Sequence, residues 1–276
     1  VGSEMCIRDR YGIQLAFKDY RVADGIWGSA WVGLKHFKTF FESYQFTNLV
    51  WNTLALSLYS LIAEFPLPIL FALFLNYISS KKLKKFSQMV TYAPHFISTV
   101  VFCGMILIFL ASDGIINQIL MILGIDPVNF LSNPANFRHI YVWSGVLKGI
   151  GWGSIMYISV LTSVGPELHE AATVDGATRF QRMLFIDIPS IIPTMVIMLI
   201  MRTGEIMDVG FEKVFLLQNN INLDYSEIIS TYVYKVGIQG GQFSYSAAIS
   251  VFNNVINLLL LLAVNTIARR TSENSL

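Results

Sequence analysis

The sequence contains few charged residues and almost no cysteine, and these shortages narrow the class of protein. Only 13% of its 276 residues are Asp, Glu, Lys or Arg, whereas a soluble domain has about 25%. The hydrophobic share is 54%, the mean hydropathy is +0.56 and the formal net charge is +1. The composition therefore indicates a protein of the lipid bilayer, and the charge gives no sign of a nucleic-acid partner.

Motifs for catalytic, cofactor and metal chemistry are also missing from the sequence. Cys6 and Cys103 lack metal-ligand spacing, and Cys103 falls in an apolar block where we expect a buried thiol. The four histidines fit no zinc pattern. The glycines at 149, 151 and 153 lack the Walker spacing of a phosphate-binding loop. We therefore expect no catalytic residues, no cofactor and no metal, and a chain that does not itself hydrolyse ATP.

Long apolar runs are what the sequence has in abundance. Residues 86–112 and 236–268 contain no Asp, Glu, Lys or Arg, and about 20 apolar residues are enough for a helix to span the hydrocarbon core. The pattern favours an all-α, polytopic transmembrane helical bundle over a closed barrel. Five spans are predicted, at about 49–78, 88–110, 139–161, 188–209 and 246–268.

The segments between the runs predict how the chain is oriented. Residues 1–10 read as a spurious leader with no apolar core, residues 11–48 as an extracytoplasmic or interfacial segment, and residues 49–270 as the transmembrane domain. Four lysines within 81–85, together with Arg269 and Arg270, place these ends and the C-terminus in the cytoplasm by the positive-inside rule. Five spans then put residue 11 outside, which an additional upstream span would explain.

Polar side chains within the predicted spans are candidates for a translocation path. Ionisable groups at membrane depth are rare and often functional. Structural roles are the alternative: Arg202 and Glu205 are three residues apart and can pair with each other, and amides can hydrogen-bond between helices. The candidates are Glu64, Lys148, Arg202, Glu205, Asn253 and Asn257.

A polar stretch at residues 165–193 interrupts the apolar second half of the chain. Pro166 is placed to begin a helix, Gly176 to end it, and a second helix is expected to run into Pro189. A helix–turn–helix between two spans needs a protein partner or a solvated surface. We predict that it lies in the cytoplasm, between the third and fourth spans.

The spacing within this stretch resembles the EAA loop of bacterial ABC-importer permeases. The matching residues are Glu170-Ala171-Ala172, Gly176 after three more residues, Ile186 after nine more, and Ile188-Pro189 after one more, with Ile188 where the family usually has Leu. Four further stretches, at 25–37, 92–98, 151–157 and 211–246, resemble the LplB-like group of carbohydrate permeases. The resemblance covers about residues 11–270.

The resemblance implies a fold and a coupling mechanism. The fold would be that of type I ABC-importer permeases (MetI-like), which usually have six spans, so the first span is expected to be missing and the chain N-terminally truncated. The loop at 165–188 would be a coupling element that inserts into a separate ATPase subunit. Its implied contact and turn residues are Glu170, Ala171, Ala172, Asp175, Gly176, Ile186 and Pro189.

The resemblance also implies partners and a location. The expected partners are an ABC ATPase dimer, a second homologous permease in a heterodimer, and an extracytoplasmic binding protein that delivers a sugar or oligosaccharide. The expected location is the bacterial cytoplasmic membrane. A stand-alone secondary transporter or channel, with the intramembrane charges as ion-coupling groups, is the alternative function.

Overall fold

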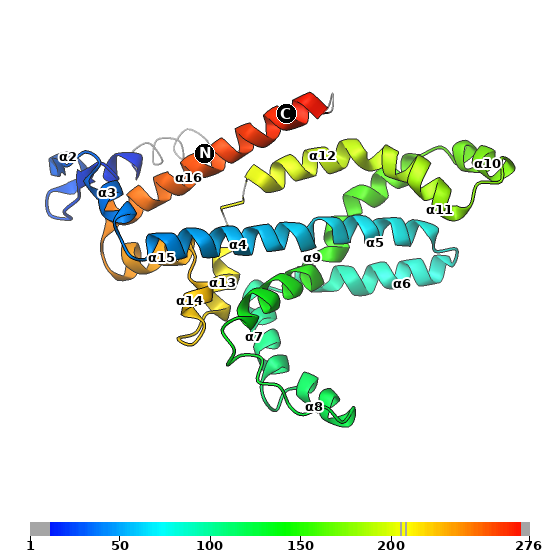
Figure 1. The fold of residues 1–276 in the computed structure, drawn as a ribbon, viewed down its shortest axis with the longest axis horizontal. Helices are drawn as coiled ribbons and strands as arrows, with labels where there is room; N and C mark the ends of the chain where they lie inside the picture. The colour runs from blue at the N-terminus through cyan, green and yellow to red at the C-terminus, as the bar shows by residue number, and fades with distance from the viewer. Residues whose placement is uncertain (1–11, 205, 208, 272–276) are drawn as a thin grey trace.

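The chain folds into long helices that run along one axis of the molecule (Figure 1). The computed structural model describes residues 12–271 except 205 and 208, with side chains as far as Thr266. The proposed leader at 1–10, Glu205 and the side chains of Arg269 and Arg270 therefore lie outside the described part. The helices are α2 (Gly25–Gly28), α3 (Lys35–Phe41), α4 (Phe46–Glu64), α5 (Pro66–Tyr77), α6 (Lys81–Tyr92), α7 (Thr99–Leu110), α8 (Ile115–Ile122), α9 (Asn136–Ser163), α10 (Pro166–Val174), α11 (Arg179–Arg182), α12 (Ile188–Gly204), α13 (Phe211–Leu217), α14 (Leu223–Ser226), α15 (Ile229–Tyr234) and α16 (Phe243–Thr271).

Tighter or wider turns join several of these helices. A 3₁₀ turn, η1 (Ala93–Phe96), links α6 to α7, and two π-helical turns, η2 (Met183–Asp187) and η3 (Lys235–Gln239), follow α11 and α15. Pro189 follows η2 and has no N–H to donate to the carbonyl of Phe185. The N–H of Ile188 bonds instead to Met183, five residues back, which is the hydrogen bond of a π turn.

Four helical stretches in the described residues are long and apolar enough to cross a membrane. They are Phe46–Tyr77, Thr99–Ile122, Arg179–Gly204 and Phe243–Thr266. The expected third span is α9, which has 28 residues and reaches about 42 Å at 1.5 Å per residue. It is less apolar than the other four because it contains Arg138, Lys148 and a run of glycines. The all-α, polytopic architecture is confirmed.

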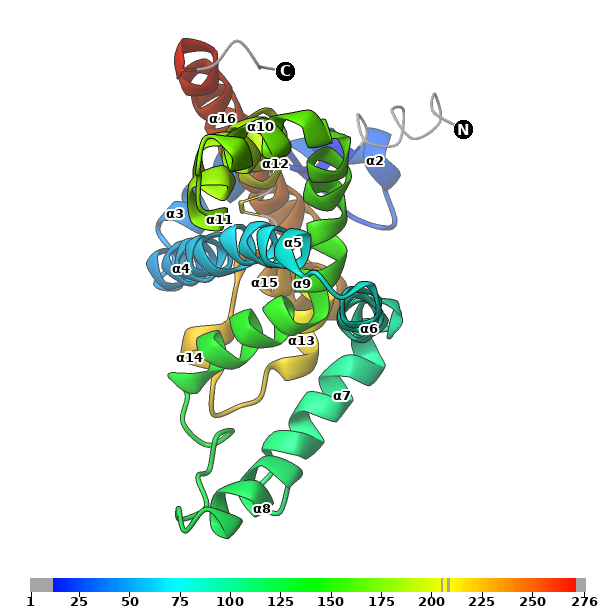
Figure 2. The same ribbon diagram turned by 90° about the vertical axis from the view of Figure 1, so that its right-hand side faces the viewer.

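Two helices differ in their bounds from the predicted spans. The span expected over 88–110 is not one helix: α6 ends at Tyr92, η1 contains Pro94, and Ser98 caps the separate helix α7 by accepting a hydrogen bond from the N–H of Val101 at 3.4 Å. The span expected over 188–209 begins earlier, at Arg179, and ends at Gly204. In Figures 1 and 2, α7 and α8 extend away from the body formed around α9.

Prolines also interrupt the first long helix. Phe65 separates α4 from α5, and Pro66 opens the second helix, where its missing N–H removes a backbone bond. Figure 1 shows that α5 nevertheless continues in roughly the direction of α4. The interruption therefore creates a joint directly beside Glu64 without turning the chain away.

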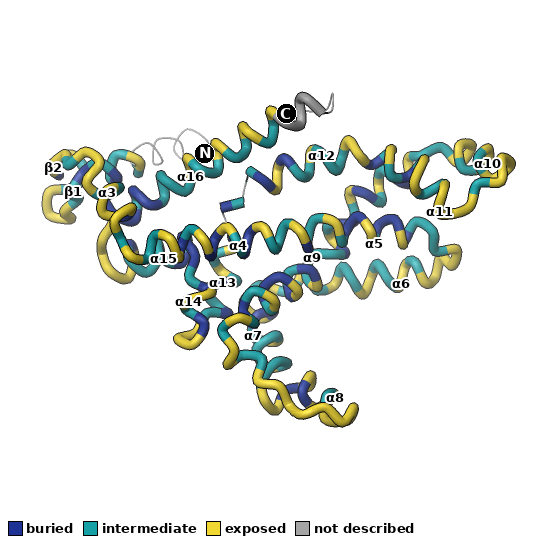
Figure 3. The backbone as a smooth tube through the Cα atoms, in the orientation of Figure 1, coloured by how far each residue is buried: buried dark blue, intermediate teal, exposed yellow. Residues whose placement is uncertain are grey.

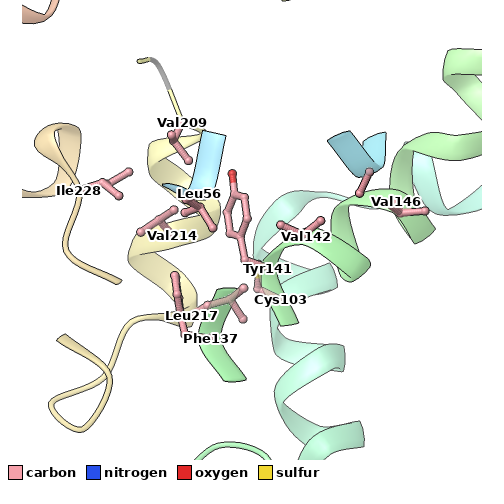
Figure 4. Packing of buried hydrophobic residues seen from close by; sticks show 11 residues of the cluster. Leu56, Cys103, Phe137, Tyr141, Val142, Val146, Val209, Val214, Leu217 and Ile228 are labelled. Carbon is pink, nitrogen blue, oxygen red and sulfur yellow. The ribbon is translucent and has the colours of Figure 1, made fainter. Parts of the chain in front are cut away.

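One of the core clusters in the described residues lies where α9 crosses α4, α7 and α13; others lie between α16 and its neighbours and between α5, α9 and α12. Figure 4 shows the Tyr141 ring of the first cluster between side chains of its helices, with its hydroxyl toward the Val209 side. Cys103 is buried there as a free thiol, as expected. Two α9 glycines permit close packing, since a side chain at Gly151 would overlap Thr91 of α6 and one at Gly153 would touch Pro68 of α5 at 3.2 Å. The glycine run is thus a packing surface in part.

A small ordered unit precedes α3 where the sequence indicated an interfacial segment. Strands β1 (Lys18–Asp19) and β2 (Ala30–Trp31) pair antiparallel. Lys18 is only 4% exposed, and its ammonium donates to the Ile26 carbonyl at 2.7 Å and lies 5.5 Å from the centre of the Trp31 ring. This cation–π cluster was not predicted from the sequence.

Candidate functional site

The polar loop at 165–188 is a defined helix–turn–helix at one end of the molecule (Figure 1). Helix α10 begins at Pro166 and ends with Gly176 in the left-handed region at φ +79°. The N–H of Ala177 bonds to Ala172 at 2.8 Å and that of Gly176 to Thr173 at 3.1 Å. These two bonds form a Schellman motif, which satisfies carbonyls that the helix end would otherwise leave unpaired. The predicted role of Gly176 in ending the helix is confirmed.

A capping box restarts the helix two residues later. The N–H of Thr178 donates to Gln181 Oε1 at 2.8 Å, and the N–H of Gln181 donates to Thr178 Oγ1 at 3.3 Å. Arg182 closes the turn, because its guanidinium donates to Thr173 Oγ1 of α10 at 2.9 Å. Local hydrogen bonds therefore fix the angle between α10 and α11.

Helix α10 presents its surface to the outside of the chain. None of its nine residues is buried, and Figure 3 shows exposed backbone at this end. Val174 is 88% exposed and Leu168 58% exposed, beside the exposed Glu170. An exposed apolar surface with polar neighbours is typical of a protein–protein contact.

The predicted loop residues differ in how far they are exposed. The exposed positions are Glu170, Ala171, Asp175, Gly176 and Pro189, whereas Ala172 and Ile186 are partly buried. Asp187, between Ile186 and the last two motif residues, is fully buried. Its carboxylate accepts from the Tyr77 hydroxyl at 2.5 Å and lies 3.4 Å from His169 Nε2. Sequence reasoning missed Asp187, although a lone Asp in an apolar stretch was a signal.

A second cluster of charges surrounds Glu64 at the end of α4. Arg202 of α12 approaches it at 3.7 Å, and Lys213 of α13 lies beside it, as both Lys213 and Glu64 would touch a side chain placed at Gly145. The Lys213 ammonium also donates to the Tyr141 carbonyl at 2.5 Å. Glu64 and Arg202 line a pocket of about 120 Å³. The structure thus brings together two of the six candidate path residues and adds Lys213.

Three of the other candidates have contacts or surroundings away from this cluster in the described residues. Lys148 donates to Thr99 of α7 at 3.2 Å. Asn257 accepts from the N–H of Met207 at 2.9 Å, which is the packing role weighed for it. Asn253 lines a separate pocket of about 390 Å³ between α15 and α16. Glu205 lies outside the described residues, so its pairing with Arg202 stays a prediction.

Comparison with known proteins identifies the family. Residues 65–273 match the family described as the binding-protein-dependent transport system inner membrane component. The chain belongs to this family. Two curated relatives from Bacillus subtilis are similar to the chain over most of its length. One, the polygalacturonan/rhamnogalacturonan transport system permease protein YteP, is 41% identical over 96% of the chain and 83% of its own length. The other, the protein LplB, is 38% identical over 96% and 84% respectively.

A solved structure supports the same assignment of the fold. The chain superposes with a TM-score of 0.90 and 39% identity on a chain of a bacterial alginate ABC transporter, in complex with an alginate pentasaccharide-bound periplasmic protein. The match covers 98% of the present chain and 90% of the alginate transporter chain. The expected type I permease fold is therefore confirmed, and the protein is a membrane transport subunit and not an enzyme.

Proposed function

We propose that the chain is one permease subunit of an ATP-driven importer that moves an oligosaccharide across the bacterial cytoplasmic membrane. The observation that carries the proposal is the loop at 165–188, whose helix α10 is exposed, set at a fixed angle and partly apolar. Such an element can insert into a cleft of a separate ATPase subunit. Movement of that subunit would then bias the bundle between inward- and outward-facing states.

The loop residues have distinct roles in this proposal. Glu170 offers its charge to basic groups of the ATPase, and Ala171 and Ala172 allow a close approach because their side chains are small. Asp175 and Gly176 form the turn, and Ile186 and Pro189 connect it to α12. Glu64 and Arg202, with their pocket, contribute to the translocation path.

The orientation rests on charge. The lysine-rich start of α6 and the loop at 165–188 lie at the same end of the molecule (Figure 1). The positive-inside rule assigns the Lys81–Lys85 end to the cytoplasm, so the loop and the ATPase share that side. The C-terminus is then also cytoplasmic, and α2 and α3 face a solute-binding protein outside. A second, homologous permease completes the path.

Relatives support an oligosaccharide as the solute. YteP is named for polygalacturonan and rhamnogalacturonan, and the superposed transporter was solved with an alginate pentasaccharide-bound protein. We therefore favour an oligosaccharide containing acidic sugars. The alternative, an ion-coupled transporter acting alone, is favoured only by the intramembrane pair of Glu64 and Arg202.

Reconstituted vesicles distinguish these functions. The chain, its ATPase, its second permease and its binding protein are placed in proteoliposomes with internal ATP. Uptake of labelled oligogalacturonides, alginate oligosaccharides and neutral arabino-oligosaccharides is measured. Uptake that needs ATP and the ATPase supports the importer, whereas uptake by the chain alone, driven by an ion gradient, supports the alternative.

Charge reversal within α10 tests the docking surface. We expect Glu170→Lys to weaken binding of the ATPase subunit, because it would repel basic groups in the cleft. Glu167→Lys is the matched control, since Glu167 is exposed on the same helix, in its first turn. Equal loss of binding in the two variants would contradict the role of Glu170.

A further inference from the structure

Asp187 is buried at the point where the loop at 165–188 meets the end of α5. Its exposed fraction is 0%, and a buried carboxylate is costly unless it is paired or hydrogen-bonded. The Tyr77 hydroxyl donates to Oδ2 at 2.5 Å, the Asn76 amide donates to Oδ1 at 3.5 Å, and His169 Nε2 lies 3.4 Å from Oδ1. At 2.5 Å, the Tyr77 bond is the shortest of these three contacts.

The π turn determines where this carboxylate points. Asp187 is the last residue of η2, and a π turn accommodates one more residue than an α turn. Side chains after it are rotated by roughly 100° relative to an unbroken α-helix. Pro189 comes two residues after Asp187 and cannot donate to Phe185. The Ile–x–Ile–Pro end of the motif therefore directs the intervening side chain inward.

The partners of Asp187 belong to elements that are far apart in the chain. Tyr77 ends α5, which lies 110 residues before Asp187, and His169 belongs to α10. These two elements also line an open pocket of about 770 Å³, whose lining includes Asn76, Tyr77, His169 and Glu170. The contacts of Asp187 thus join α10 to α5 beside a gap that protein atoms do not fill.

We propose that Asp187 is a positioning residue that transmits movement of α10 to α5. This inference rests on the proposed function, because it needs an ATPase docked on α10. When α10 moves, the carboxylate carries the Tyr77 end of α5 with it. The other end of α5 is the proline joint at Phe65, next to Glu64 and its partner Arg202. These contacts of Asp187, the Asp187 tie, therefore connect the docking surface to the charged pocket through α5, in addition to the helical stretch Arg179–Gly204 on which Asp187 and Arg202 themselves lie.

Removal of one hydroxyl tests the tie. Tyr77→Phe removes the donor to Asp187 and keeps the ring. In the complete complex with its ATPase, second permease and binding protein, we expect normal assembly and continued ATP hydrolysis. We expect the ATP hydrolysed per oligogalacturonide or alginate oligosaccharide taken up to rise roughly tenfold, the size expected for loss of a hydrogen bond to a charged group. Tyr157→Phe is the matched control, since Tyr157 is a buried tyrosine of α9 that is not among the partners of Asp187.

A double-mutant cycle identifies Asp187 as the acceptor. If Tyr77→Phe and Asp187→Asn act through one contact, the double variant loses no more coupling than the more severe single variant. If the Asp187→Asn complex fails to assemble, the test uses Tyr77→Phe and His169→Gln instead. The measured quantity is again the ATP hydrolysed per oligosaccharide taken up. If this ratio is unchanged in both variants while the wild-type complex shows ATP-driven uptake, the proposed role of Asp187 is wrong and the proposed function stands. Absence of ATP-driven uptake in the wild-type complex overturns the proposed function instead.

Discussion

Gly176 offers the sharpest test of the coupling loop, because its backbone conformation can be altered without a steric clash. Its φ is +79°, and a side-chain carbon added there would meet nothing within 4 Å. The substitution Gly176→Ala therefore costs only the conformational term, roughly 1–2 kcal/mol for an L-residue in the left-handed region. At 25 °C this corresponds to a change of roughly 5- to 30-fold in the population of the turn.

The expected result is a weaker complex with the ATPase subunit. If the ATPase binds only the turn observed here, its Kd for the permease rises by up to roughly 5- to 30-fold, because the apparent affinity falls with the fraction of free permease that adopts the turn. Binding is measured by titrating the labelled ATPase onto the permease in nanodiscs. Gly176→Asn should bind more tightly than Gly176→Ala, because Asn tolerates this backbone region better.

A matched control exists at the end of α8. Gly124 has φ +77°, also with nothing within 4 Å, and Ile125 closes the same kind of motif by bonding to Leu120 at 2.9 Å. Gly124→Ala imposes the same backbone cost far from α10 and should leave the Kd unchanged. The reasoning is refuted if Gly176→Ala binds like the wild type, or if both alanine variants weaken binding equally.

Three further outcomes follow from the packing. Gly151→Ala should lower the free energy of unfolding, measured by a thermal melt in detergent, by about 1–3 kcal/mol, since the new methyl overlaps α6. Gly149→Ala places its methyl in open space and should leave the free energy of unfolding unchanged or raise it by up to about 1 kcal/mol. Glu64→Gln should destabilise by about 1–3 kcal/mol, because Lys213 loses its counter-charge, and Lys213→Met in the same chain should recover part of the loss in a thermal melt. Thr178→Ala removes the cap of α11, and its cost of about 1 kcal/mol should appear as roughly fivefold faster amide exchange over 178–187; unchanged exchange would contradict this.

Features determined by neighbouring residues could be predicted from the sequence. The helix at 166–174, its termination at Gly176 and the proline interruption near Glu64 all depend on backbone chemistry within a few positions. Proline lacks a donor and glycine tolerates positive φ whatever the rest of the chain does. The apolar runs likewise identified the membrane helices, although the break at Pro94 was missed because apolarity alone does not show where a helix changes direction.

Features determined by distant residues could not be predicted in the same way. Helical spacing could propose only Glu205 as a partner of Arg202, and that pairing stays a prediction. The contact of Arg202 with Glu64 at 3.7 Å joins two different helices and could not be read from spacing. Lys213 was not considered, because it follows the fourth span in a stretch expected outside the membrane. Asp187 was noticed only as an unnamed position within the motif, since its partners Tyr77 and His169 come from α5 and α10.

Two of the prolines at helix interruptions, Pro66 and Pro189, follow a carboxylate that contacts another helix. Glu64 lies two residues before Pro66 and pairs with α12, and Asp187 lies two residues before Pro189 and bonds to α5. An interrupted helix can bend at lower cost, because a backbone hydrogen bond is already absent. A polar contact at the same place fixes which neighbouring helix moves with the segment. Each of the two sites therefore combines a helix interruption with a polar contact to a neighbouring helix. Helix α5 begins at Pro66 and is bonded near its other end to Asp187. It is therefore the segment that these contacts would move as a rigid body.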